Sequence, residues 1–509
     1  MASLTEEERE IQKEEERRAK EQSKLELERI KRRTFIKKKS VSTALAISDI
    51  IKRFLKIFFN TIRMIFFVGS GFLKKVFYFA WKSIGIFCNR LDKIWIRVSL
   101  FSEKKISVPV CILVVLVIYI GIAYLTGFHV FGLTVLPPTM QFYVCDYSVG
   151  FCSRLFVGAV IALFSDKVTI AQMNAIINTA IFISLIGQAV IVGIFLRIAL
   201  KNKSVPATMM GLLMLTNPLG IVENICAPGL LDVYLLILFF LWLLLFKTPA
   251  VIVVTPIFCF TGLAIHYEFL FTFLPPILTL LLYYAFLAEK KRVRIESWLA
   301  FVIGSVVSLV FFFYFVFYAK NNLKMTSDEF YLYMLSRLSI TKNEKEALTL
   351  WMGAPLFRTY FDYYIFGQNE GYDFFHNFSE FFSTLNHLAF SQFNVSMFLR
   401  DLVLFSPTYI LASVIWGKCA AREKGVRKIP YILFIGQALV LIPELFLSTD
   451  IWRWFSATLL TQFFVFAVVY TDKYALVHRI IDKTEISPIV GVAILSVVLC
   501  YSFYGVTLV

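Results

Sequence analysis

Apolar runs dominate the chain from residue 106 onward and alternate with short polar connections. Most runs approach the ~20 apolar residues that an α-helix needs to cross the hydrocarbon core of a bilayer. The pattern predicts an all-α fold, a polytopic transmembrane helical bundle of about eleven spans. The expected spans are Ile106–Leu125, Asn174–Leu200, Ala207–Val222, Leu230–Phe246, Val251–Ile265, Leu270–Leu287, Trp298–Tyr318, Leu402–Trp416, Ile429–Leu447, Phe455–Tyr470 and Pro488–Leu508.

Two segments of different character precede this multispan domain, which we place at 101–509. Residues 1–46 are dense in Glu, Lys and Arg, as is typical of a solvated cytoplasmic helix or a disordered tail. In residues 47–100, Lys or Arg interrupts each apolar stretch, which predicts a basic amphipathic segment on the membrane surface. A single span within 64–78 is the alternative.

Composition supports the membrane interpretation and argues against nucleic-acid binding. The chain is 58% hydrophobic and 17% charged, and it contains 54 Phe residues. This apolar content exceeds what the core of a soluble domain requires. The net charge of +16 comes mainly from the N-terminal hundred residues and from short loops between spans. That placement indicates membrane lipids rather than nucleic acid as the partner.

The positions of the short basic loops predict the topology. Loops rich in Lys and Arg stay in the cytoplasm, and simple alternation from a cytoplasmic N-terminus places all of them on that side. We therefore expect an integral protein of the plasma (inner) membrane with two large outer loops, 126–172 and 320–401. The expected inner loops are Lys201–Lys203, the loop at Lys247, Glu289–Arg294, Gly417–Lys428 and Thr471–Arg479.

Ionisable residues at the outer ends of the spans are the candidates for chemistry, because such groups are costly at membrane depth. An outward-facing polar cavity under the second large loop is one interpretation, and solvated span ends are the other. Three cysteines, Cys145, Cys152 and Cys226, share this side, where a disulfide could form. The outer set comprises Asp146, Arg154, Glu223, Asp232, His266, Glu268, Glu444, Asp450 and Arg453.

The string CDYSVGFCSRLFVGAVIALF, residues 145–164, is the most specific of these. Asp146 precedes apolar residues at helical spacing, so an amphipathic helix would hold this acid or base at a fixed depth. The guanidinium of Arg154 could bind a phosphate through two parallel hydrogen bonds. Alternatively, Asp146 is a helix cap or turn residue and Arg154 is its ion-pair partner or a lipid contact.

Two further strings contribute candidate binding residues. In HYEF, His266 and Glu268 lie two residues apart and would act together only in a tight turn, on an acceptor sugar or a metal. In STDIWRWF, Asp450 and Arg453 have helical spacing, and Arg453 beside Trp454 could grip a phosphate next to a sugar ring. The ordinary alternatives are a water-exposed turn and an interfacial aromatic belt.

The first-loop Asp146, the amphipathic segment after it and the large late outer loop resemble GT-C-type glycosyltransferases, multispan enzymes that use polyprenyl-phosphate-linked sugars. The strings DYSVGFCSR, HYE and DIWRW also resemble uncharacterised bacterial membrane proteins of surface-polysaccharide synthesis in the cell envelope. The resemblance implies transfer of a sugar from a lipid-linked donor to a glycan acceptor on the extracytoplasmic face. It implies Asp146 as the catalytic base or a metal ligand; no cofactor is assigned, and a divalent metal stays open.

Three rival functions use other parts of the chain. An O-antigen-polymerase-like or ligase-like enzyme would rely on Arg337, Arg358 and His376 of the late loop. A transporter or flippase predicts charges near mid-membrane and two related halves, and the sequence displays neither. A membrane scaffold would depend on the charged N-terminus.

Overall fold

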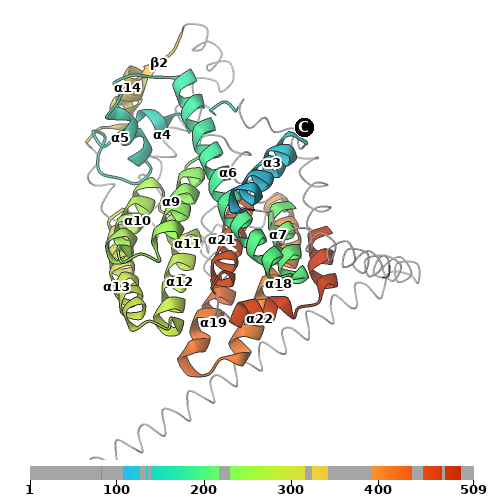
Figure 1. Cartoon of the computed structure of the whole chain (residues 1–509). Helices are drawn as coiled ribbons and strands as arrows, with labels where there is room; N and C mark the ends of the chain where they lie inside the picture. Colours follow the sequence, from blue (N-terminus) through green and yellow to red (C-terminus); the bar gives the residue numbers. More distant parts are fainter. Residues whose placement is uncertain are drawn as a thin grey trace, which may run out of the picture. The chain divides into compact units, whose positions relative to one another are not determined.

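The computed structural model describes residues 82, 107–125, 133–135, 139–216, 230–315, 324–341, 392–437, 451–472 and 476–494 (Figure 1). The chain divides into two units, residues 1–85 and 86–509, and Lys82 is the one described residue of the first unit. The expected tail (1–46) and the expected amphipathic segment (47–100), apart from Lys82, therefore lie outside the described residues.

Helices make up most of the described residues, which agrees with the helical class that the apolar pattern predicts. Their bounds are α3 Val108–Leu125, α4 Gln141–Val144, α5 Phe156–Ala162, α6 Ile170–Lys201, α7 Val205–Thr216, α9 Asp232–Leu245, α10 Val251–Ile265, α11 Phe269–Thr272, α12 Leu274–Leu287, α13 Lys291–Phe313, α14 Ser327–Arg337, α18 Gln392–Arg422, the 3-10 helix η6 Gly425–Lys428, α19 Ile429–Gly436, α21 Ile451–Tyr470 and α22 Leu476–Asp482. The described strands are β1 Val168–Thr169 and β2 Leu338–Ser339, which pair in parallel.

Several helices differ from the expected spans at their ends. Helix α13 begins at Lys291 rather than Trp298, because Lys, Arg and Glu are good helix formers whose long side chains can extend to water. Helix α18 begins at Gln392, inside the range 320–401 that was expected to be outer loop. Helix α22 occupies part of an expected inner loop. Local hydropathy marks the apolar stretch of a helix and misses its polar ends.

Three helical segments among the described residues are long and apolar enough to cross a membrane: α6, the α11–α12 segment Phe269–Leu287, and α13. Shorter apolar helices occupy further expected span positions, in α3, α7, α9, α10 and α21. Helix α13 leaves large apolar side chains uncovered, with Val306 54% and Val310 58% exposed. An apolar exterior of this kind fits a membrane protein, since a soluble monomer rarely exposes so large an apolar area.

Small residues allow the apolar helices to approach closely. Helices α10, α12 and α13 lie side by side (Figure 1). A Cβ added at Gly304 of α13 would lie 2.8 Å from the Thr255 side chain of α10. Thr255 also accepts a hydrogen bond from Trp242 of α9, at 3.1 Å from the indole nitrogen. Close contact through small residues, with a polar bond across helices, is the usual way in which helices associate in membranes.

Asp482, at the end of α22, is the centre of a polar cluster that joins three segments. It accepts hydrogen bonds from Ser204, before α7, and from Tyr470, at the end of α21. His478 lies one helical turn earlier, with its Nδ1 3.0 Å from the Asp482 carboxylate. The other ring nitrogen of His478 lies 2.7 Å from the Asn202 amide, after α6. One carboxylate therefore fixes the ends of α6, α21 and α22.

Asp472 makes a second such junction at the same end of α21. Its carboxylate forms an ion pair with Lys247 at 2.8 Å and accepts a hydrogen bond from the Tyr284 hydroxyl near the end of α12. The Lys247 ammonium also lies 5.5 Å from the centre of the Tyr284 ring. Helix α12 in turn contacts η6. These contacts bring together the ends of helices that the charge pattern assigns to one membrane side.

We expect Asp482→Asn to lower the thermal stability of the detergent-solubilised protein. The substitution removes the negative charge opposite His478 and replaces one of the two acceptor oxygens with an NH₂ donor. Loss of a hydrogen bond to a charged group costs about 1–3 kcal/mol. The matched control is Glu485→Gln, since Glu485 is exposed and lies three residues away. A fluorescence-detected melting curve measures the difference, and equal melting temperatures for both variants would show that the cluster adds nothing.

Candidate functional site

Asp146 lies in the turn that follows α4, where the local sequence fixes its carboxylate. The backbone N–H of Ser148 donates to Asp146 Oδ1 at 2.8 Å, and the Ser148 hydroxyl donates to the same oxygen at 2.5 Å. The N–H of Val149 donates to the Asp146 carbonyl at 3.2 Å. An Asp that accepts a bond from the backbone two residues later is a common turn device. The turn interpretation of Asp146 is therefore correct, and the carboxylate keeps its second oxygen for another partner.

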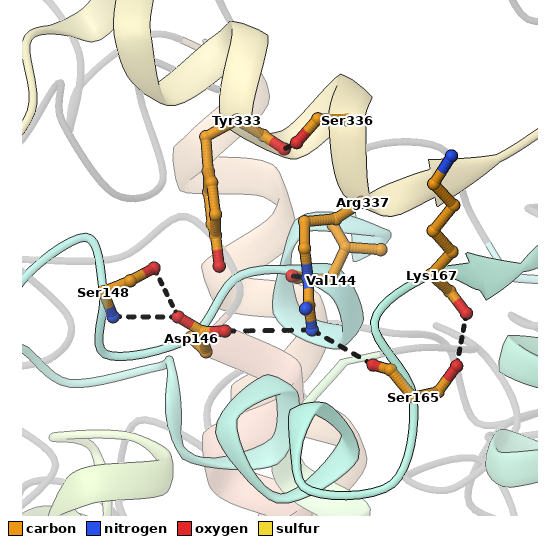
Figure 2. A network of polar contacts seen from close by, with 8 residues as sticks. All are labelled: Val144, Asp146, Ser148, Ser165, Lys167, Tyr333, Ser336 and Arg337. Atoms are coloured by element: carbon orange, nitrogen blue, oxygen red, sulfur yellow. Dashed lines mark hydrogen bonds and ion pairs between the residues drawn. The ribbon is translucent and has the colours of Figure 1, made fainter.

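That partner is Arg337, the last residue of α14. Its Nη2 lies 3.8 Å from Asp146 Oδ2, its Nε donates to the Val144 carbonyl at 3.3 Å, and Nη2 also donates to the Ser165 carbonyl at 3.4 Å (Figure 2). Both charged side chains are mostly buried, with 16% of Asp146 and 12% of Arg337 exposed. The ion pair that the structure assigns to Asp146 is thus with Arg337 of the late loop, and not with Arg154 as the ordinary alternative expected.

The backbone holds α14 in position over the Asp146 turn. Pairing of β1 with β2 aligns Val168 with Leu338, the residue directly after Arg337. The N–H of Lys324, before α14, donates to the Val149 carbonyl at 2.8 Å. At its N-terminus α14 is capped by a reciprocal pair of bonds between Thr326 and Glu329. Two segments that are far apart in sequence, both of which were expected to be outer loops, therefore meet around one carboxylate.

Tyr333 joins Asp146, Ser148 and Arg337 in one polar cluster and helps to set the pKa of Asp146. Burial by itself raises the pKa of Asp146, but the hydrogen bonds from Ser148 and Tyr333 and the positive charge of Arg337 outweigh it and lower the pKa below the ordinary aspartate value. Burial, together with the nearby Asp146 charge and hydrogen bond, raises the pKa of the Tyr333 hydroxyl. At neutral pH the site presents a carboxylate, a guanidinium and a phenol that keeps its proton.

Arg154 lies in the next turn, against the end of α10. Its backbone has φ of 75°, a conformation uncommon for a residue with a side chain. The Arg154 N–H donates to the Ala264 carbonyl at 2.9 Å, and the Ser153 hydroxyl donates to the Leu263 carbonyl at 2.7 Å. The guanidinium is buried, donates to the Tyr267 hydroxyl at 2.7 Å and lies 4.8 Å from the ring centre. Helix α5 packs on α10 in this region.

His266 and Glu268 do form the tight turn that their spacing required. His266 Nδ1 lies 3.4 Å from the Glu268 carboxylate and accepts the Glu268 backbone N–H at 3.2 Å. Glu268 is only 1% exposed, and the His266 side chain is 12% exposed. Glu268 is thus buried in this turn, whereas His266 keeps part of its side chain at the surface. Arg154 and the His266–Glu268 turn are neighbours, since Tyr267 between the two contacts Arg154.

Other predicted outer residues have different outcomes. Asp232 is buried at the start of α9, beside a hydroxyl contact of 3.3 Å between Tyr234 and Tyr143. Cys145 and Cys152 are free thiols. Outside the described residues lie Asp450, Glu223, Glu444, Cys226, Arg358 and His376, together with the side chains of Arg453 and Trp454, whose backbone belongs to α21.

Sequence reasoning missed two members of the cluster, Tyr333 and Ser148, and named Arg337 only for the rival polymerase-like function. A signal for each exists in hindsight. Tyr333 and Arg337 are four residues apart and share one helix face, and Asp-x-Ser is a pattern of turns. The pairing of α14 with the first loop has no local signal. Among the described residues, no group of three or more His, Cys, Asp or Glu could hold a metal ion.

Comparisons with known proteins add no identification. No family model matches the chain, and neither the curated proteins nor the solved structures contain a match.

A close backbone approach positions the Asp146 turn on α5. A Cβ added at Gly158 would lie 1.9 Å from the carbonyl oxygen of Cys145, which is a backbone atom of the residue before Asp146. We expect Gly158→Ala to push α5 away from this turn and to destabilise the protein by about 1–3 kcal/mol. The control is Gly121→Ala in α3, where the added Cβ meets nothing within 4 Å. If Gly158→Ala and Gly121→Ala melt at the same temperature, the expected clash does not occur.

The Asp146–Arg337 pair predicts a pH-dependent contribution to stability. Because the folded pKa of Asp146 is lowered, the contribution is fully present above the ordinary value of 3.8 and is lost as pH falls through the folded value. A double-mutant cycle of Asp146→Asn and Arg337→Met should yield a coupling of roughly 0.5–3 kcal/mol at pH 7. Additive effects at pH 7 would show that the two side chains do not interact.

Proposed function

We propose that the chain is a polytopic membrane glycosyltransferase-like enzyme that transfers a sugar from a polyprenyl-phosphate-linked donor on the extracytoplasmic face. The placement rests on about eleven apolar spans and on basic loops that assign the N-terminus to the cytoplasm. The plasma (inner) membrane is the proposed location. The observation that carries the chemistry is the ionised Asp146 carboxylate beside the Arg337 guanidinium.

This pair has the two charges that glycosyl transfer requires. An acceptor hydroxyl attacks the anomeric carbon, the new C–O bond forms as the bond to the lipid phosphate breaks, and the hydroxyl proton passes to Asp146. The departing phosphate keeps the electron pair of the broken bond, so a nearby cation lowers the barrier. Arg337, 3.8 Å from the Asp146 carboxylate, is the proposed cation.

Competition for Arg337 would adjust Asp146 during turnover. In the free protein the guanidinium contributes to the lowered pKa of Asp146, which makes this carboxylate a weak base. A donor phosphate that draws Arg337 away removes that positive charge. The pKa of Asp146 then rises and the carboxylate accepts a proton more readily. Binding of the donor would thereby prepare the base.

Arg154, His266 and Glu268 are the proposed binding residues of the same region. Arg154 is fixed by the end of α10 and by Tyr267, and it offers a second cation for a donor phosphate. His266 and Glu268 offer one donor and one acceptor for sugar hydroxyls. From the string STDIWRWF we retain Asp450, Arg453 and Trp454 as proposed contacts of the donor phosphate and sugar.

A polymerase-like or ligase-like enzyme is the second candidate, and a specific contact favours it. Such an enzyme was expected to depend on Arg337 in the late loop, and Arg337 contacts Asp146. Both candidates thus use Arg337 and the same class of donor, but the second depends less on Asp146. They differ in the demand on Arg358 and His376.

The test is transfer of labelled sugar from a polyprenyl-phosphate donor pool by membranes that contain matched amounts of each variant. We expect Asp146→Asn to lower transfer at least 100-fold, since a positioned base contributes about 10²–10⁴-fold. Asp166→Asn is the control, because Asp166 is an exposed carboxylate of the same outer loop. Wild-type transfer by Asp146→Asn would reject Asp146 as the base. Loss in Arg358→Met or His376→Gln, with Asp146→Asn active, would select the polymerase-like candidate.

A further inference from the structure

Two basic loops at the other end of the helices meet on one surface. The first joins α12 to α13, and the second joins α18 to α19 through η6. We call their joint surface the cationic loop pair. It includes the helix residues next to each loop. At the first loop and the start of α13 lie Lys290, Lys291, Arg292 and Arg294; at the end of α18 and in the second loop lie Lys418, Arg422, Lys424, Arg427 and Lys428; three acidic residues, Glu289, Glu296 and Glu423, accompany them.

Contacts between the helices hold the two loops together. The 3-10 helix η6 contacts α12 as well as α18 and α19, and α12 contacts both α13 and α19. Deeper in the bundle the rings of Tyr283 on α12 and Tyr431 on α19 lie 5.9 Å apart, nearly perpendicular. The charges of the two loops therefore act as one field and not as two separate ones.

Carboxylates neutralise little of this charge. Among the described residues of the pair, Arg292 forms an ion pair with Glu296 at 2.6 Å, and Arg294 donates to a backbone carbonyl at 3.2 Å. Lys247, a basic residue elsewhere at this end of the bundle, is by contrast neutralised by an ion pair with Asp472. The net charge of the pair is +6, from nine basic and three acidic side chains. A surface with such an excess attracts an anionic partner.

Exposed apolar side chains border the basic residues. On α13, Ile295 and Trp298 are exposed within a turn of Arg294, and on α19, Ile429 and Ile432 are exposed directly after Lys428. Trp at the end of an apolar helix is typical of the headgroup level of a bilayer. A ligand for this surface must therefore be anionic at one end and apolar at the other, which a nucleic acid or a free phosphate is not.

We propose that the cationic loop pair binds the headgroups of anionic phospholipids in the inner leaflet, with the acyl chains along the exposed faces of α13 and α19. Basic residues between membrane helices commonly bind lipid phosphates in this way. The inference uses the membrane placement of the helices but not the sugar-transfer chemistry, so either can fail without the other. It assigns a selective lipid contact to the loops rather than a general attraction to the membrane.

Native mass spectrometry of the full chain tests this, after exchange into detergent with equal amounts of phosphatidylglycerol and phosphatidylcholine. The wild type is expected to retain phosphatidylglycerol in preference. The triple variant Lys424→Gln/Arg427→Gln/Lys428→Gln should bind it at least tenfold more weakly, since each basic residue near an anionic surface contributes roughly fivefold. The basic N-terminal region is present in all variants and cancels in the comparison.

The matched control is Lys201→Gln/Arg479→Gln/Lys483→Gln, which removes the same charge from exposed positions at the end of α6 and in and directly after α22. Binding by the control should stay within about twofold of the wild type. Equal losses in both triple variants, or a wild type without preference for phosphatidylglycerol, would overturn the proposal. If the first triple variant fails to fold by size exclusion, Lys290→Gln/Lys291→Gln/Arg294→Gln on the other loop must produce the loss.

Discussion

Polar contacts at helix ends determine how this chain is arranged, because apolar helices with an apolar exterior gain little from burying one more apolar face against another. In such surroundings an unpaired polar group is costly, so each contact between polar groups at a helix end selects one arrangement of neighbours. Asp472 and Asp482 act in this way at one end, where they fix the ends of α6, α9, α12, α21 and α22. Packing of small residues such as Gly304 then sets how closely the helices approach.

The carboxylates of Asp482 and Asp146, at opposite ends of the helices, differ in how much of their hydrogen-bonding capacity other side chains use. Asp482 already accepts from Ser204 and Tyr470 and lies against His478, so its bonding capacity is used by the fold. Asp146 is held through one oxygen by Ser148, while the other faces Arg337 at 3.8 Å. That separation is longer than a good hydrogen bond. The contact between Asp146 and Arg337 is therefore looser than the contacts that Asp482 makes with Ser204 and His478.

Charge has a different use on the opposite surface. The basic residues around η6 and at the start of α13 are exposed, apart from the half-buried Lys428. They mostly lack carboxylate partners among the described residues and lie next to uncovered apolar side chains. A membrane of mixed lipids supplies both the anion and the apolar contact that such a surface needs. The proposed chemistry on one face and the proposed lipid contact on the other thus follow from one rule, which is that the charges discussed here for the described helices lie at or near helix ends.

The sequence by itself determined the helical class, the positions of most apolar helices and several polar turns, including the one at Asp146, since hydropathy and turn chemistry act over a few neighbouring residues. It misplaced the polar ends of α13 and α18 and joined Asp146 to Arg154 in its ordinary alternative. Only the tertiary structure decided that Arg337 and Tyr333 face Asp146, and that Asp472 and Asp482 are structural. Those pairs are separated by tens to hundreds of residues, and the packing that unites them leaves no periodic trace along the chain.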